Sequence, residues 1–213
     1  MPRVVLVDPR LAAFAAVVCV THHLGLLTRP LGALGPTRTN DWLDLLTPYL
    51  VVGCGLWVLL AVRTSRPTWL LAGVGGVMYV QGHALHLSAN SISNAEPTGR
   101  AADAAHIWDE VVSHHLWYAG LTILVIALAL ALHDHPLRIT ALGWALAVGV
   151  GVTYATNAIG GGTAPASLLA ASGLAIWGAH TESATAAGVM PASGSARRSR
   201  LRRRRWPRRD SGR

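Results

Sequence analysis

The sequence contains no lysine, only two cysteines and few charged residues of any kind. Charged residues make up 13% of its 213 positions, whereas hydrophobic residues make up 52% and gather in long runs without charge. This is the composition of an integral membrane protein. Cys19 and Cys54 both lie inside apolar runs. Two such thiols exclude the dense cysteine framework of a small secreted domain.

Because lysine is absent, the net charge of +8 comes from eighteen arginines, ten of which lie between 197 and 213. A basic run beside a membrane span favours contact with anionic lipid headgroups on the cytoplasmic side over specific nucleic-acid binding. We therefore expect a membrane domain over residues 1–185. A disordered, basic cytoplasmic tail is expected over 186–213.

The N-terminal apolar run, 11–27, lacks a small-x-small cleavage site and contains His22 and His23. These features predict a retained first membrane span and exclude a cleaved signal peptide.

A membrane span needs about 20 mostly apolar residues, and the chain has six candidate runs. They cover residues 11–27, 43–62, 68–90, 106–132, 137–157 and 166–180, with a surface loop over 91–105. The arginines lie mainly on the side that holds both termini, which makes that side cytoplasmic by the positive-inside rule. The predicted fold is thus an all-α, polytopic bundle of about six transmembrane helices in the cell membrane.

The stretch 82–118 places five histidines and the adjacent acids Asp109 and Glu110 against long apolar runs. Ionisable side chains at membrane depth are costly and usually mark a functional site. At 3.6 residues per turn, each i, i+4 step along a helix turns the side chain by only about 40°, so a stripe of such residues forms one face. Two such faces on neighbouring helices can meet, which predicts one metal site. Its expected ligands are His83, His86, His106, Glu110 and His114.

Imidazole combined with carboxylate suits a divalent transition metal, zinc first and iron or copper next. Further polar residues are expected on the same outer side of the membrane as a second shell, namely His22, His23, Asp41, Asp44, Asn90 and His115. The two aspartates can equally cap a helix, and the histidine pair can equally serve as ligands or proton carriers. His133, His135 and His180 lie apart from the cluster and are expected to be structural.

The function expected first is that of a metal-dependent enzyme, hydrolase-like, acting on a lipidic or amphipathic substrate. Asp109 or Glu110 would act as the general base beside the ion. One alternative is a non-enzymatic membrane protein that binds or transports a metal ion or haem. Another is an iron- or copper-dependent membrane oxidase or hydroxylase that uses the same ligands.

The segment from His83 and His86 to Asp109 partly resembles membrane hydrolases of the alkaline-ceramidase type. Those are small helical bundles with zinc held by histidines from separate helices, and the resemblance implies similar chemistry. Their paired histidines on the final helix are absent here, where His180 stands alone. His114 and His115 look a little like a histidine box of membrane desaturases and hydroxylases, but those boxes face the cytoplasm. No family is assigned from these likenesses.

Overall fold

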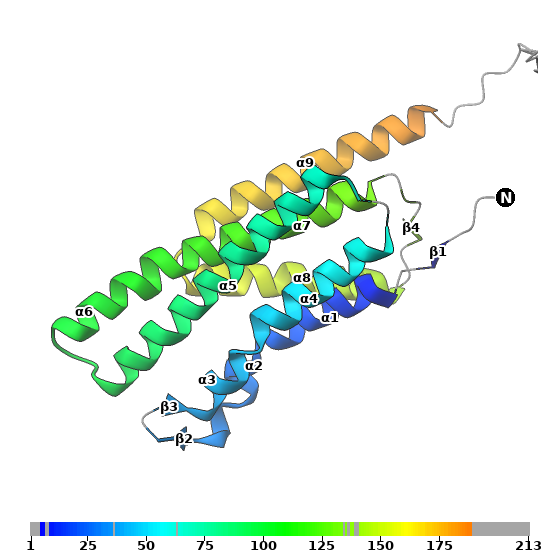
Figure 1. The fold of residues 1–213 in the computed structure, drawn as a ribbon. Helices are drawn as coiled ribbons and strands as arrows, with labels where there is room; N and C mark the ends of the chain where they lie inside the picture. The colour runs from blue at the N-terminus through cyan, green and yellow to red at the C-terminus, as the bar shows by residue number, and fades with distance from the viewer. Residues whose placement is uncertain are drawn as a thin grey trace, which may run out of the picture. The chain divides into compact units, whose positions relative to one another are not determined.

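The computed structural model describes residues 5–6, 9–35, 37–62, 64–133, 135, 137–138 and 141–188, and the described chain is mostly helical (Figure 1). Contacts divide it into two units, Met1–Leu174 and Ala175–Arg213. The site described below lies in the first unit. In the second, the described residues form the remainder of the last helix. The predicted tail, 186–213, lies outside the described residues from 189 onward.

The first half of the chain forms short helices and two very short strand pairs. Its helices are α1 (Pro9–Thr21), α2 (Leu24–Leu27), the 3-10 turn η1 (Arg29–Leu31), α3 (Thr39–Asp44) and α4 (Thr47–Ala61). Strand β1 (Val5–Leu6) pairs in parallel with β4 (Leu137–Arg138), and β2 (Ala33–Leu34) pairs antiparallel with β3 (Thr37–Arg38). The sequence did not predict these strands, which lie within or beside stretches expected to be connections.

From Arg66 onward the described chain is almost entirely helical. Its helices are α5 (Arg66–Ala95), α6 (Arg100–His106), the π-helix η2 (Ile107–Ser113), α7 (His114–Leu132), α8 (Ala141–Gly160) and α9 (Ala164–Gly188). The loop predicted over 91–105 is largely helical, because α5 continues to Ala95 and α6 begins at Arg100. Asn94 donates its side-chain amide to the carbonyl of Asn90 at 2.6 Å, within the helical extension.

The first predicted span is interrupted at its histidine pair, where α1 ends and α2 has not begun. The Nδ1 atoms of His22 and His23 lie 2.9 and 2.8 Å from the carbonyl oxygens of Val18 and Cys19. Carbonyls at a helix end can lack a helical donor, although that of Val18 still accepts from the backbone N–H of His22 at 3.4 Å. The two imidazoles therefore satisfy the end of α1 and are held close to its backbone.

Three segments of the described chain are long and apolar enough to cross a membrane: Thr39–Ala61, Arg100–Leu132 and Ala141–Gly160. Pro9–Thr21 and Ala164–Ile176 are shorter apolar helices. Large apolar side chains face outward, with Leu60 73% and Leu169 77% exposed. Exposed apolar surface on this scale marks an interaction with lipid or another apolar partner. These features indicate a membrane protein.

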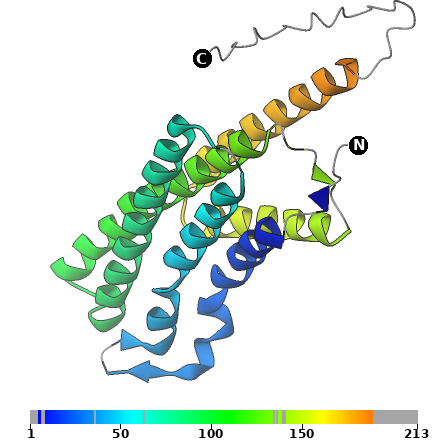
Figure 2. The same cartoon turned by 45° about the vertical axis from the view of Figure 1, so that its right-hand side comes forward.

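Helices α5 and α7 lie side by side in both views (Figures 1 and 2), and glycines allow their backbones to meet. A Cβ atom added at Gly75 would lie 2.7 Å from the backbone nitrogen of Leu124. A Cβ atom added at Gly82 would lie 2.7 Å from the carbonyl oxygen of Ser113. A Cβ atom added at Gly120 would lie 2.7 Å from the carbonyl oxygen of Gly75. Small residues at membrane helix interfaces permit this close approach. The contact sets the distance between the polar residues of the two helices.

We predict that Gly120→Ala destabilises the protein by about 1–3 kcal/mol, because the added methyl group overpacks a backbone contact. The measurement is the free energy of unfolding in mixed detergent micelles. Gly73→Ala on α5 is the control, since nothing lies within 4 Å of an added Cβ there. It should be neutral or stabilising by up to about 1 kcal/mol through helix propensity. Equal effects of the two substitutions would refute the glycine contact.

Candidate metal centre

The local helix geometry at Ile107–Ser113 decides which acid joins the histidines. On a regular α-helix, Asp109 and His114 would point about 140° apart. In a π-helix the hydrogen bonds join residues five apart, so these two positions come nearly into line. Both side chains are buried, and the hydroxyl of Ser113 donates to the carbonyl oxygen of Asp109. The π-helix therefore presents Asp109 and His114 together toward α5.

His86 on α5 completes a group of three possible ligands. Its Nδ1 lies 2.5 Å from Oδ1 of Asp109, and its ring centroid lies 5.0 Å from that of His114. One ligand atom from each of the three residues lies within 4.8 Å of the other two. Two imidazoles and one carboxylate at such separations can converge on a single ion after small side-chain shifts.

The His114 ring is fixed from two sides. A Cβ added at Gly161, in the turn between α8 and α9, would lie 2.9 Å from Cγ and Cδ2 of this ring. The backbone of that turn therefore packs directly on the imidazole. Oε2 of Glu110 lies 3.6 Å from Nδ1 of His114, beyond hydrogen-bond distance, and this buried Nδ1 has no hydrogen-bond partner among the described residues.

A third histidine, His83, is positioned through the effect of a proline on a neighbouring carbonyl. Pro48 has no N–H, so the carbonyl of Asp44, four residues earlier, lacks its helical donor. Nε2 of His83 lies 3.1 Å from that carbonyl oxygen and 3.4 Å from the Asp44 carboxylate. The carboxylate also accepts a 2.7 Å hydrogen bond from Thr47. Because a carbonyl only accepts, Nε2 carries the proton and Nδ1 keeps a lone pair.

That Nδ1 atom of His83 is buried and has no hydrogen-bond partner in the described part of the chain. Buried polar atoms without partners are rare and call for a reason. In His22, by comparison, both ring nitrogens have a partner. Nδ1 bonds to a backbone carbonyl, and Nε2 lies 3.0 Å from the hydroxyl of Tyr79. His83 thus offers an available lone pair, whereas His22 holds Tyr79 in place.

These groups surround a polar cavity of about 420 Å³, which we call the histidine cavity. Its lining residues are His22, His23, Asp44, His83, His86, Trp117, Thr156 and Asn157. No arginine lies among them, and His86 belongs both to the cavity wall and to the three-residue group. A cavity with a carboxylate and several imidazoles favours a cation or a polar, hydrogen-bonding ligand.

Three of the five predicted ligands, His83, His106 and Glu110, are outside the group of three. His106 is exposed at the end of α6, whereas His83 faces the histidine cavity beside Asp44. His115, predicted as a second-shell residue, is exposed, and its Nδ1 lies 2.6 Å from the carbonyl oxygen of Val111. Glu110 and His114, expected on one face, do lie 3.6 Å apart, but the π-helix brings Asp109 into the group of three in place of Glu110.

The remaining predicted residues have local roles. Asp41 lies 3.3 Å from the guanidinium of Arg38 and accepts from its backbone N–H, which stabilises the start of α3. Asn90 accepts a 3.0 Å hydrogen bond from the side chain of Asn94. Asp44, in contrast, lines the histidine cavity.

Sequence reasoning missed three residues that shape the site. Trp117 is buried and stacks with His22 at a centroid distance of 5.6 Å. Its place three residues after His114 could have indicated the same helix face. Pro48 and Gly161 have no feature in the sequence that marks them as part of a site. Their contacts depend on residues far away in the sequence.

No known family model, curated protein or solved structure matches this chain. The chemistry of the site is therefore inferred from its own residues.

We predict a strong energetic coupling between His86 and Asp109 in protein treated with a chelator. A double-mutant cycle with His86→Ala and Asp109→Ala should give a coupling energy of about 1.5–3 kcal/mol, as expected for a partly buried hydrogen bond to a charged group. The measurement is again the free energy of unfolding.

The control cycle uses Arg38 and Asp41, an ion pair whose arginine side chain is 41% exposed. Its coupling should stay below about 1 kcal/mol. A His86–Asp109 coupling no larger than that of the control would contradict the geometry.

Proposed function

We propose that the chain is a polytopic membrane metalloprotein that binds one divalent transition metal ion through His86, Asp109 and His114 and uses it in hydrolysis. The observation that carries this proposal is the convergence of the three ligand atoms within 4.8 Å. Two of the three side chains are buried. Acids and histidines gathered only by chance would more often be exposed.

The donor set favours zinc, since two imidazoles and one carboxylate match its common nitrogen and oxygen ligands. Catalytic zinc sites hold the ion through three protein ligands and keep a fourth position open. Metal ligands bind in their deprotonated forms, so binding releases protons and the affinity for the metal should rise with pH. A bound ion of this kind supplies a Lewis acid that can activate water.

Two other carboxylates have supporting roles in this proposal. Asp44 faces the histidine cavity, which also contains His86, and is held by Thr47 and His83. We assign it the role of proton acceptor, in place of the base first expected at Asp109 or Glu110. Glu110 lies beside Nδ1 of His114 and acts as a positioning residue that fixes the orientation of this ring.

The proposed orientation has about six spans with both termini in the cytoplasm. On the first side, Arg10 lies at the start of α1 and Arg66 at the start of α5. On the second side, Arg38 precedes α3 and Arg100 is the first residue of α6. Arg29 adds one arginine to the second side, and the other arginines of the sequence, including the ten beyond 196, increase the excess on the first side. The positive-inside rule then assigns the metal centre to the outer half of the membrane.

We expect His86→Ala, Asp109→Asn and His114→Ala each to reduce bound zinc to about a tenth or less, since each removes one of three ligands. A variant that combines any two of these substitutions should lose little more zinc than the single variants, because the ligands act as one unit. The measurement is elemental analysis of purified protein after dialysis against zinc, together with an absorption spectrum. Glu110→Gln should weaken binding about tenfold, as loss of an outer-shell partner does.

His106→Ala and His115→Ala are the matched controls, because both remove an exposed histidine from the same helical segment. Each should leave the zinc content unchanged. Full occupancy in two of the three ligand variants would place the ion elsewhere. Tightly bound iron or copper would favour oxidative chemistry, and a haem absorption band would favour the non-enzymatic alternative.

The orientation predicts that a cysteine at Thr98, in the turn between α5 and α6, reacts with a membrane-impermeant maleimide in intact cells. The background would carry alanine at Cys19 and Cys54. A cysteine at Thr64, in the connection between α4 and α5, should react only after permeabilisation. The reverse pattern would place the metal centre on the cytoplasmic side.

A further inference from the structure

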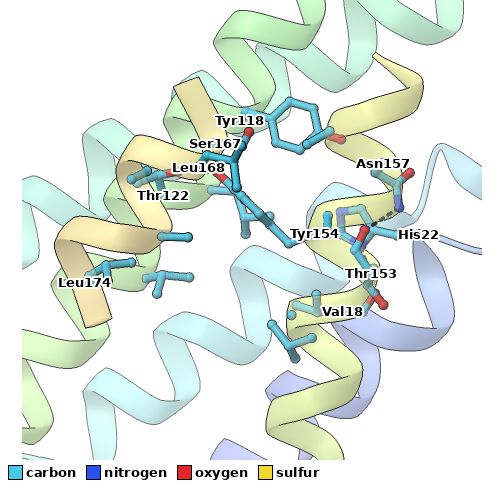
Figure 3. Close-up of a pocket in the computed structure, with 18 of the residues that line it drawn as sticks. Val18, His22, Tyr118, Thr122, Thr153, Tyr154, Asn157, Ser167, Leu168 and Leu174 are labelled. Carbon is cyan, nitrogen blue, oxygen red and sulfur yellow. Dashed lines mark hydrogen bonds between the residues drawn. The ribbon is translucent and has the colours of Figure 1, made fainter. Parts of the chain in front are cut away.

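A second cavity, of about 410 Å³, lies between α1, α7, α8 and α9 within the first unit (Figure 3). Its wall is mostly apolar and runs along the helices, from Tyr118 to Val125 on α7 and from Val150 to Ile159 on α8. At 1.5 Å per residue these stretches measure about 10 and 14 Å. The volume falls within the range of about 300–1,000 Å³ typical of small-molecule sites. The shape suits one extended chain.

Several polar groups of this cavity lie toward one of its ends, whereas Thr153 lies near Val18 (Figure 3). Figure 3 shows Tyr118, Ser167 and Asn157 toward that end, and Leu174 and Val18 toward the other. Among the polar side chains in the middle, Thr122 and Tyr154 are joined to each other by a 2.8 Å hydrogen bond. The cavity is therefore amphipathic along its length.

The hydroxyl groups of Tyr118 and Ser167 are buried and lack a hydrogen-bond partner among the described residues. Both residues are less than a tenth exposed, at 5% and 6%. Leaving such a group unpaired costs about 1–3 kcal/mol, so two of them at one apolar cavity indicate a ligand with a hydrogen-bonding group. A carbonyl or hydroxyl attached to a long alkyl chain meets this requirement.

This polar end adjoins the histidine cavity. His22 and Asn157 line both this cavity and the histidine cavity. A ligand with its alkyl chain in the apolar cavity would therefore place its polar group next to the wall that both cavities share.

We propose that the apolar cavity binds a lipid with a single acyl chain, whose carbonyl or hydroxyl group is bound by Tyr118 and Ser167. That this lipid is the substrate rests on the proposed metal-dependent hydrolysis, whereas its binding does not. The chain points away from the metal centre, toward Leu174 and Val125, and the polar group points toward His22 and Asn157.

The test is photo-crosslinking of the full-length protein in nanodiscs with palmitic acid that carries a diazirine in its chain. Labelling should map to lining residues of α8 and α9 and should be reduced by unlabelled palmitic acid or monopalmitoylglycerol. The better competitor identifies the ligand as a free acid or an ester. Tyr118→Phe and Ser167→Ala should each weaken competition about threefold to tenfold, as expected for one lost hydrogen bond. Tyr49 is 61% exposed, so Tyr49→Phe should leave competition unchanged.

Gly151→Leu should reduce labelling at least about tenfold by filling the cavity, which contains free space at this lining position. Gly53→Leu is the matched control, since an added Cβ also meets nothing there, but the residue does not line the cavity. Equal labelling of these two variants, or labelling that neither competitor reduces, would overturn the lipid site. Zinc measured on the same samples separates the proposals: zinc without cavity labelling refutes only the lipid site, and labelling without zinc refutes only the metal centre.

Discussion

The contact between the backbones of α5 and α7 is the constraint on which the site depends. Gly75, Gly82 and Gly120 have no side chains to separate the two helices, so their main chains meet directly. At that distance His86 on α5 reaches Asp109 in η2, and its ring lies beside His114 on α7. A larger residue at this interface would move apart the two halves of the proposed metal centre.

Irregular helix geometry then determines which polar atoms are available. The π-helix turns Asp109 into line with His114. The break before Pro48 frees the Asp44 carbonyl for His83, and the end of α1 binds the rings of His22 and His23. Each irregularity thus orients a polar side chain of the site. Departures of this kind are often found at functional sites.

The helical, membrane-type character followed from composition and from apolar runs, because those properties are local. The density of histidines and acids between 82 and 118 likewise pointed to the region in which His86, Asp109 and His114 meet. The approach of Asp109 to His86 and His114 could not be derived from sequence, because a 3.6-residue period cannot anticipate a π-helix. Gly161 and Pro48 could not be recognised, since their importance comes from contacts with residues distant in the chain. The apolar cavity depends on four helices and has no sequence signature.

X-ray absorption at the zinc edge, on purified protein loaded with one equivalent of zinc, tests the metal centre most directly. The proposed site predicts a first shell of nitrogen and oxygen atoms at about 2.0 Å, with the multiple scattering of two imidazoles. His86→Ala should remove one imidazole contribution, whereas His115→Ala should leave the spectrum unchanged. A shell that contains sulfur, or one without two imidazoles, would contradict coordination by His86, Asp109 and His114.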